Sequence, residues 1–154
     1  MILLVRWKRK RWKVTFKQRS SRNELRKADS FAAVLVGIMR YENLEVWKRS
    51  FRLSVNIHQL FAENKNFGFK DQICRSSLSV PSNIAEGLER ETEKDKARFL
   101  VIAKGSIGEL KTQIMIAIEL AYIPIELGNT LASECEEIAR MLGGFIKKIR
   151  SGIS

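Results

Sequence analysis

Three serines lie in segments rich in small residues, where an exposed hydroxyl could act as a nucleophile. They are Ser79, Ser82 and Ser106. A serine nucleophile needs a neighbouring base to take its proton, and the only histidine in the chain is His58. His58 falls on the apolar stripe of a predicted helix, so we interpret it as a satisfied core or interface histidine. We therefore do not expect a serine triad.

The acidic and sulfur-containing side chains do not form a recognisable metal site either. Glu86 and Glu109 would lie on two neighbouring helices, but a carboxylate-bridged metal site in a bundle needs Glu-x-x-His partners, which this chain lacks. We expect both carboxylates to bond to nearby side chains or helix ends. Cys74 and Cys135 are isolated, without CxxC spacing, and we interpret them as reduced core thiols. No metal and no cofactor is expected.

Two segments of small residues interrupt patterns that are otherwise typical of buried helices. They are Ser79–Gly87, which contains Pro81, and Ala103–Leu110, about one helix later. Small side chains allow close approach of two helices, so we expect the two segments to face each other. Residues 105–108 are not a phosphate-binding loop, because no strand precedes them and they lie inside a predicted helix.

Hydrophobic residues recur every three or four positions from Tyr41 onward, which predicts helices. We expect four, over about 42–63, 70–90, 92–122 and 124–150. Thr92 and Asp95 resemble a capping box at the start of the third, Pro81 should kink the second, and Gly128 should weaken the start of the fourth. The short connections favour an all-α, antiparallel, up-down-up-down four-helix bundle with a long third helix.

The pattern also predicts which faces of these helices are buried. On the first helix the core stripe is expected at Leu44, Trp47, Phe51, Val55, His58 and Phe61. The third helix carries two apolar stripes, which one neighbour cannot cover. We expect the second stripe to be an interface with another subunit, formed by Leu100, Ile107, Ile114 and Ile118.

The net charge of +11 is concentrated at the N-terminus. Residues 1–38 hold 11 Lys and Arg and two acidic residues, a net charge of +9, so residues 39–154 are left at +2. The chain thus divides into a basic extension, 1–38, and a bundle domain, 39–154. No apolar run is long enough to span a bilayer, and the first residues do not resemble a secretory signal, so we expect a cytoplasmic protein without integral membrane association.

Two interpretations of the extension stay open. Its mixture of basic residues with Trp7 and Trp12 is typical of segments that bind phosphate backbones or an anionic membrane surface. Alternatively, translation begins at Met39, directly before the first clean helical pattern, and residues 1–38 are upstream sequence read in frame.

Basic side chains on the predicted bundle are the candidate functional surface. Lys104 and Lys111 are seven residues apart, as are Arg140 and Lys147, so each pair shares a helix face. The complete set of candidate nucleic-acid contacts is Arg75, Arg90, Arg98, Lys104, Lys111, Arg140, Lys147 and Lys148. In an oligomer, each short basic stripe would be repeated and weak phosphate contacts would add together.

Three motifs in order along the chain resemble a known family. Tyr41–Trp47, Gln72–Gly87 and Arg98–Leu110 are similar to the bacterial four-helix-bundle proteins encoded in intervening sequences of 23S ribosomal RNA. That family looks related to the accessory variability protein of diversity-generating retroelements. The resemblance covers about residues 39–150 and implies an oligomeric bundle, often a ring of five subunits, without known catalysis and associated with nucleic acid or a reverse transcriptase.

Together these observations predict a non-enzymatic, homo-oligomeric protein, with five subunits favoured, that associates with RNA or DNA. The alternative is a protein-interaction scaffold that docks a partner polypeptide such as a reverse transcriptase. Residues 1–38 lie outside the resemblance.

Overall fold

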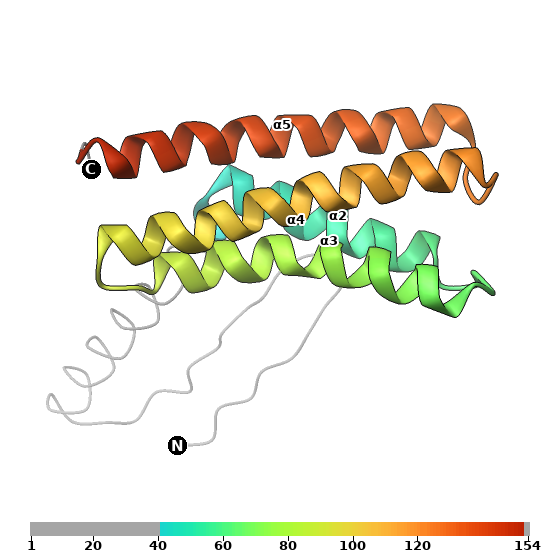
Figure 1. Ribbon diagram of the computed structural model, residues 1–154, viewed down its shortest axis with the longest axis horizontal. Coiled ribbons are helices and arrows are strands. Elements are labelled where there is room, and N and C mark those ends of the chain that lie inside the picture. Colours follow the sequence, from blue (N-terminus) through green and yellow to red (C-terminus); the bar gives the residue numbers. More distant parts are fainter. Residues whose placement is uncertain (1–40, 153–154) are drawn as a thin grey trace, which may run out of the picture. The chain divides into compact units, whose positions relative to one another are not determined.

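Four α-helices form an antiparallel bundle in the computed structural model, which describes residues 41–152 (Figure 1). A short 3-10 helix precedes them, and the elements are η1 (Tyr41–Asn43), α2 (Glu45–Leu60), α3 (Phe67–Leu88), α4 (Glu93–Glu119) and α5 (Ile125–Arg150). No strand occurs within residues 41–152. The predicted all-α four-helix bundle is confirmed, with α4 the longest helix. The predictions about residues 1–38 lie outside the described residues.

Local signals explain where three of the helices begin. The Thr92 hydroxyl accepts a hydrogen bond from the Asp95 backbone N–H at 3.1 Å, which confirms the predicted cap of α4. The Asn66 side chain caps α3 in the same way, and Pro124 occupies the cap position of α5. For the first helix the sequence offers Asn43 or Glu42 as the cap. Both lie instead in η1, and α2 follows Leu44 without a side-chain cap, so that prediction was wrong.

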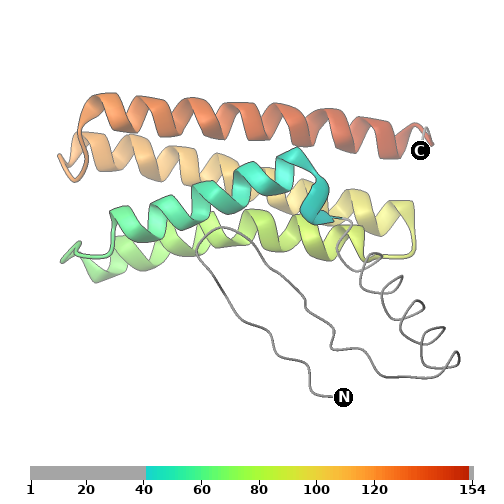
Figure 2. The same cartoon turned by 180° about the vertical axis from the view of Figure 1, so that it is seen from behind.

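The helices are arranged in chain order around the bundle. Helix α4 packs extensively against both α3 and α5, whereas α2 packs mainly against α3 and touches α5 sparingly. Seen from behind, α2 is inclined to the other three helices (Figure 2). Helices α3, α4 and α5 therefore form a broad layer, and α2 covers one side of it.

The face that α2 buries differs from the predicted one. Its buried residues are Val46, Ser50, Leu53, Ser54, Ile57 and, just after the helix, Phe61. Phe51 is 48% exposed and Val55 39% exposed, although both were expected in the core. His58 is exposed as well. The period of the pattern was correct, but only Phe61 of the predicted stripe is fully buried, because α2 has hydrophobic residues on two faces.

Buried serines take part in the contact between α2 and α3. The hydroxyl oxygens of Ser54 and Ser77 lie 3.3 Å apart, and the Ser77 hydroxyl also donates to the Cys74 carbonyl at 2.8 Å. Within residues 41–152, no buried side-chain nitrogen or oxygen lacks a hydrogen-bond partner. Small hydroxyls can therefore occupy core positions here without an unsatisfied polar group.

Helix α3 continues through Pro81, which is buried within it. The Ser82 hydroxyl donates to the Leu78 carbonyl at 2.9 Å, and the Asn83 amide donates to the Ser79 carbonyl at 2.8 Å. Side-chain donors thus surround the turn in which proline removes a backbone N–H. The hydrophobic pattern predicts that Ile73, Ser77, Val80, Ile84 and Leu88 face the core. The first four are buried, and Leu88 is half-buried against the core.

The small-residue segments of α3 and α4 meet only in part. The hydroxyl oxygens of Ser79 and Ser106 lie 2.9 Å apart across the two helices. A Cβ added at Gly87 would lie 2.9 Å from the Phe99 Cβ, so the backbones are close there. Gly105 and Gly108, however, have nothing within 4 Å of an added Cβ and point away from α3. Their predicted role in the α3–α4 contact was wrong.

Gly128, which was expected to weaken the start of the last helix, does not interrupt it, because α5 is continuous from Ile125 to Arg150. Gly128 is buried, and a Cβ there would lie 2.3 Å from the Ile118 Cγ1 atom. This glycine therefore serves packing at the turn between α4 and α5.

We expect the substitution Gly87→Ala to lower the free energy of unfolding by about 1–3 kcal/mol, because the new methyl group overpacks a backbone contact. The matched control is Gly144→Ala, in α5, where nothing lies within 4 Å of the added Cβ. It should raise stability by about 0.5–1 kcal/mol, as alanine is the better helix former. Urea unfolding followed by circular dichroism measures both, and equal effects at the two positions would contradict the proposed close contact.

Candidate nucleic-acid interface

Half of the eight predicted basic contacts are already bound to carboxylates. The pairs are Arg75 with Asp71 at 3.8 Å, Lys111 with Glu136 at 2.6 Å, Arg90 with Glu86, and Arg140 with Glu137. The Arg90 guanidinium also lies 4.6 Å from the centre of the Phe99 ring. Binding phosphate at these positions would first require the carboxylate to be displaced, so they are the weaker candidates.

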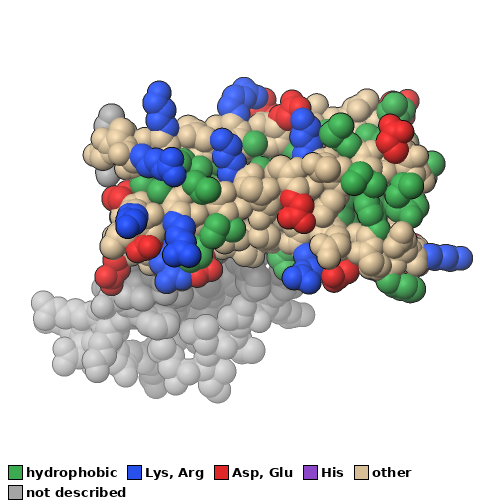
Figure 3. Space-filling view, in the orientation of Figure 1, with side chains coloured by type: hydrophobic (Ala, Val, Ile, Leu, Met, Phe, Trp, Pro, Cys, Tyr) green, Lys and Arg blue, Asp and Glu red, His purple; other side chains and the backbone are tan. Residues whose placement is uncertain are grey.

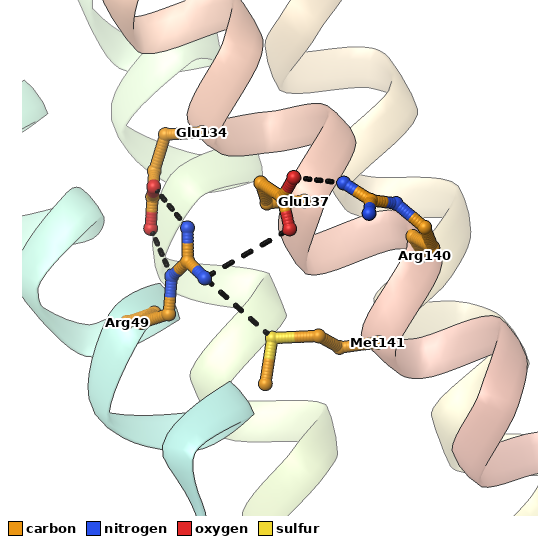
Figure 4. Close-up of polar contacts among 5 residues, drawn as sticks. All are labelled: Arg49, Glu134, Glu137, Arg140 and Met141. Carbon is orange, nitrogen blue, oxygen red and sulfur yellow. Dashed lines mark hydrogen bonds and ion pairs between the residues drawn. The ribbon is translucent and has the colours of Figure 1, made fainter.

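Arg49, which was not among the predicted contacts, joins α2 to α5 (Figure 4). The Arg49 guanidinium donates to both carboxylate oxygens of Glu134, at 2.7 and 2.5 Å, in a bidentate pair. Its remaining nitrogen lies 4.0 Å from Glu137, which also binds Arg140. The hydrogen bond from Arg49 lowers the pKa of Glu134, although partial burial acts in the opposite direction. This cluster adds polar contacts between α2 and α5, which otherwise touch sparingly. Arg140 is a weak candidate for phosphate binding, because Glu137 already binds it.

The other four predicted contacts, Arg98, Lys104, Lys147 and Lys148, have no carboxylate within 4.0 Å among residues 41–152. All four are exposed. Arg150, at the end of α5, is exposed and unpaired within the same residues, and it was missed by the sequence analysis. These five side chains come from the first half of α4 and the last turns of α5.

The antiparallel packing brings these two stretches together. Residues 96–108 contain three Lys and Arg and no acidic residue, and residues 138–152 contain four and none. The Lys104 Nζ atom lies 3.6 Å from where a Cβ of Gly143 would be, so it reaches across to α5. On the face formed by α3, α4 and α5, Lys and Arg side chains gather toward the end of the bundle where α4 begins and α5 ends (Figure 3). We call Lys104, Lys147 and Arg150 the basic seam. The absence of acidic residues from both stretches was the signal that could have identified it. Lys148 is not part of it, because it lies about 140° around α5 from Gly143, on the side of Met141 that contacts α2.

A shallow hollow lies beside the basic seam, between the start of α4 and the end of α5. Its lining includes Arg98, Arg150, Val101 and Ile102. Glu93, which also lines it, is paired with Lys96 at 2.7 Å. Asp95 lines it as well, so the hollow combines Arg98 and Arg150 with two carboxylates and some apolar surface. The two guanidinium groups are the part of it that can bind phosphate.

The side chains that were considered for catalysis or metal binding have other partners. His58 is exposed, which corrects its expected burial, and its Nδ1 donates to the Ser54 carbonyl at 2.8 Å. Glu109 accepts from Gln113 at 3.2 Å. In the part of the chain that the structure describes, no cluster of three or more His, Cys, Asp or Glu could hold a metal ion.

Both cysteines are free thiols within the bundle. Cys135 is buried, and burial raises the pKa of its thiol to about 12. Cys74 is half-buried, and desolvation raises its pKa as well. Neither has the lowered pKa of a reactive cysteine.

The four residues predicted to form a subunit interface on the third helix lie instead in or against the core of the same chain. Leu100, Ile107 and Ile114 are at most 1% exposed within the single chain, so no second subunit can reach them. Ile118 is half-buried and packs against the core. The exposed hydrophobic residues of α4 are instead Val101, Ile102, Met115 and Ile116, followed by Leu120 just after it.

None of the helices in residues 41–152 has the length and hydropathy needed to cross a bilayer.

Comparison with known proteins points to one family. The sequence profile of the 23S rRNA-intervening sequence proteins matches residues 42–144. A crystal structure of a protein of unknown function from the S23 ribosomal protein family of Bacteroides thetaiotaomicron is similar, with 28% identity and a TM-score of 0.63. The alignment covers 66% of this chain and 98% of that one. No curated protein matches the chain.

We expect Arg49→Gln to lower the free energy of unfolding at pH 7 by about 1–2 kcal/mol, because it removes a bidentate, charge-assisted pair. Since the pKa of Glu134 is lowered in the folded state, this contribution is present above the usual glutamate pKa and is lost as the pH falls through the folded value. The difference from the parent chain should therefore shrink below about pH 4. Urea unfolding at several pH values measures it.

Arg75→Gln is the matched control, because Arg75 is 75% exposed and its pair with Asp71 is open to solvent. It should cost less than about 0.5 kcal/mol at any pH. An equal loss for both variants would show that Arg49 does not join α2 to α5 more strongly than an ordinary surface pair.

Proposed function

The chain belongs to the family of 23S rRNA-intervening sequence proteins, and we propose that it is a non-enzymatic, homo-oligomeric accessory protein that associates with RNA or DNA. The observation that supports this function most directly is the basic seam. Its three cations lie on two packed helices, and no carboxylate within residues 41–152 lies within 4.0 Å of any of them.

Such a surface should bind the phosphate backbone rather than particular bases. Binding of this kind depends on the release of counterions and weakens steeply as salt rises. The seam has no aromatic side chain on which a base could stack, so sequence preference should be small. One subunit supplies few contacts, and useful affinity requires several copies acting together. The resemblance to the family favours five.

The alternative function is a scaffold that docks a partner polypeptide, such as the reverse transcriptase of a diversity-generating retroelement. The exposed hydrophobic residues along α4 support a protein contact of some kind. A neighbouring reverse transcriptase gene would favour this partner, whereas flanking ribosomal RNA would favour the first proposal.

We expect the double substitution Lys104→Gln with Lys147→Gln to weaken binding to a single-stranded RNA of mixed sequence and to lower the slope of log K against log salt. Each lost phosphate contact should reduce that slope by about 0.7–0.9. Fluorescence anisotropy between about 50 and 200 mM salt measures both quantities.

The matched control is Lys111→Gln with Arg140→Gln, which removes the same charge from two side chains already paired with carboxylates. It should leave the slope nearly unchanged. If both double variants lose affinity equally, net charge and not the basic seam is responsible. If the parent chain does not bind RNA at about 50 mM salt, the scaffold is the better proposal.

A further inference from the structure

The hollow between the start of α4 and the end of α5 has an apolar floor and one apolar side. Ala97 and Ile149 form the floor and are 5% and 8% exposed. Val101 and Ile102 form the side and are 43% and 42% exposed. The volume of the hollow is about 1210 Å³, larger than most sites for small molecules. A ligand with a broad apolar part therefore fits it better than an isolated phosphate ion.

The register of the two helices joins this hollow to the basic seam. Lys104 reaches Gly143 across the antiparallel pair of α4 and α5. Seven residues further along each helix, about two turns, Ala97 is level with Arg150, and both line the hollow. Arg150 belongs to the hollow and to the seam, so a ligand bound in one can continue into the other.

Three cations line the hollow, and its two carboxylates already have partners. Lys94, Arg98 and Arg150 are exposed, and among residues 41–152 no carboxylate lies within 4.0 Å of them. Asp95 accepts a hydrogen bond from the Thr92 hydroxyl at 2.6 Å, and Glu93 is paired with Lys96. Hydrophobic side chains lie among Lys and Arg at this end of the face (Figure 3). The hollow thus combines unpaired positive charge with exposed apolar surface.

We propose that the hollow receives one unstacked base of a single-stranded nucleic acid, while the adjoining phosphates contact Arg98 and the basic seam. Phosphate alone would leave Val101 and Ile102 in contact with water, whereas the flat face of a base covers them. A guanidinium can also stack on a base, and Arg98 lies one turn before Ile102 on the same side of α4. Every base has such a face, so the sequence preference stays small.

This inference rests on the proposed function and specifies its ligand as single-stranded. In a duplex the faces of the bases are covered by their neighbours, so a duplex offers the hollow only its backbone. The basic seam, in contrast, contacts the phosphates of either form. Met115 and Ile116 lie outside the hollow and stay available to a protein partner.

Removing the bases from the ligand tests the contact without changing the number of phosphates. The full chain should bind a single-stranded DNA of mixed sequence at least about threefold more tightly than an abasic strand of equal length. Fluorescence anisotropy at about 50 and 200 mM salt measures both dissociation constants. Each affinity should fall as salt rises, but their ratio should stay nearly constant, because contact with the face of a base is mainly apolar.

Substitutions in the hollow identify where the base binds. Val101→Ser with Ile102→Ser should remove most of the preference for the strand with bases, and leave the salt slope and the affinity for a duplex unchanged. Serine has about the helix propensity of valine and isoleucine, and both positions are exposed, so circular dichroism should show unchanged helix content. The matched control is Met115→Ser with Ile116→Ser, which alters two exposed residues of the same helix beyond the hollow and should keep the full preference.

Arg98→Lys tests the guanidinium separately, because it keeps the charge and removes the planar group. It should lower the ratio of the two affinities and leave the salt slope unchanged.

Equal affinity for the strands with and without bases would overturn this inference and leave the proposed function standing. A preference that survives Val101→Ser with Ile102→Ser, or that the control pair loses to the same extent, would also overturn it. A parent chain that binds neither strand nor a duplex at about 50 mM salt refutes the proposed function itself.

Discussion

Burial of one face of α4 is the constraint on which the rest of the structure depends. Leu100, Ile107 and Ile114 are almost completely inaccessible, and α4 is the helix that packs extensively on two neighbours. Once these residues point into the core, the helix has no rotational freedom left. Lys104 must then point toward α5, Ser106 toward α3, and Ile102 toward solvent. The position of Lys104 in the basic seam and the exposure of Val101, Ile102, Met115 and Ile116 are both consequences of that one orientation.

Ion pairing determines which of the many basic residues are available to a partner. The bundle from residue 39 onward is nearly neutral, so net charge says little about binding. The distribution of charge is more informative. Residues 96–108 and 138–152 contain no acidic residue, and the packing of α4 on α5 places these two stretches side by side. A lysine without a carboxylate neighbour keeps its full attraction for phosphate, whereas Lys111 must first be released from Glu136.

The sequence was sufficient to predict the helices, the capping box at Thr92 and the core face of α3, because these depend on local chemistry and on one clear apolar stripe. It was insufficient to assign the buried faces of α2 and α4. Both helices carry hydrophobic residues on two sides, so the period is clear while the rotation about the axis is not. On α2 the buried positions include Ser50, whose hydroxyl donates to the Trp47 carbonyl at 2.9 Å, and hydropathy alone disfavours such a residue in a core.

The two surfaces of α4 respond to different physical variables, and this separates their roles. Contact between phosphate and the basic seam would be electrostatic and weakened by salt, whereas contact through the exposed Val101, Ile102, Met115 and Ile116 would be apolar and little affected by salt. Raising the salt should therefore separate the two kinds of contact, because it weakens RNA binding through the seam and leaves a protein contact through the apolar residues in place.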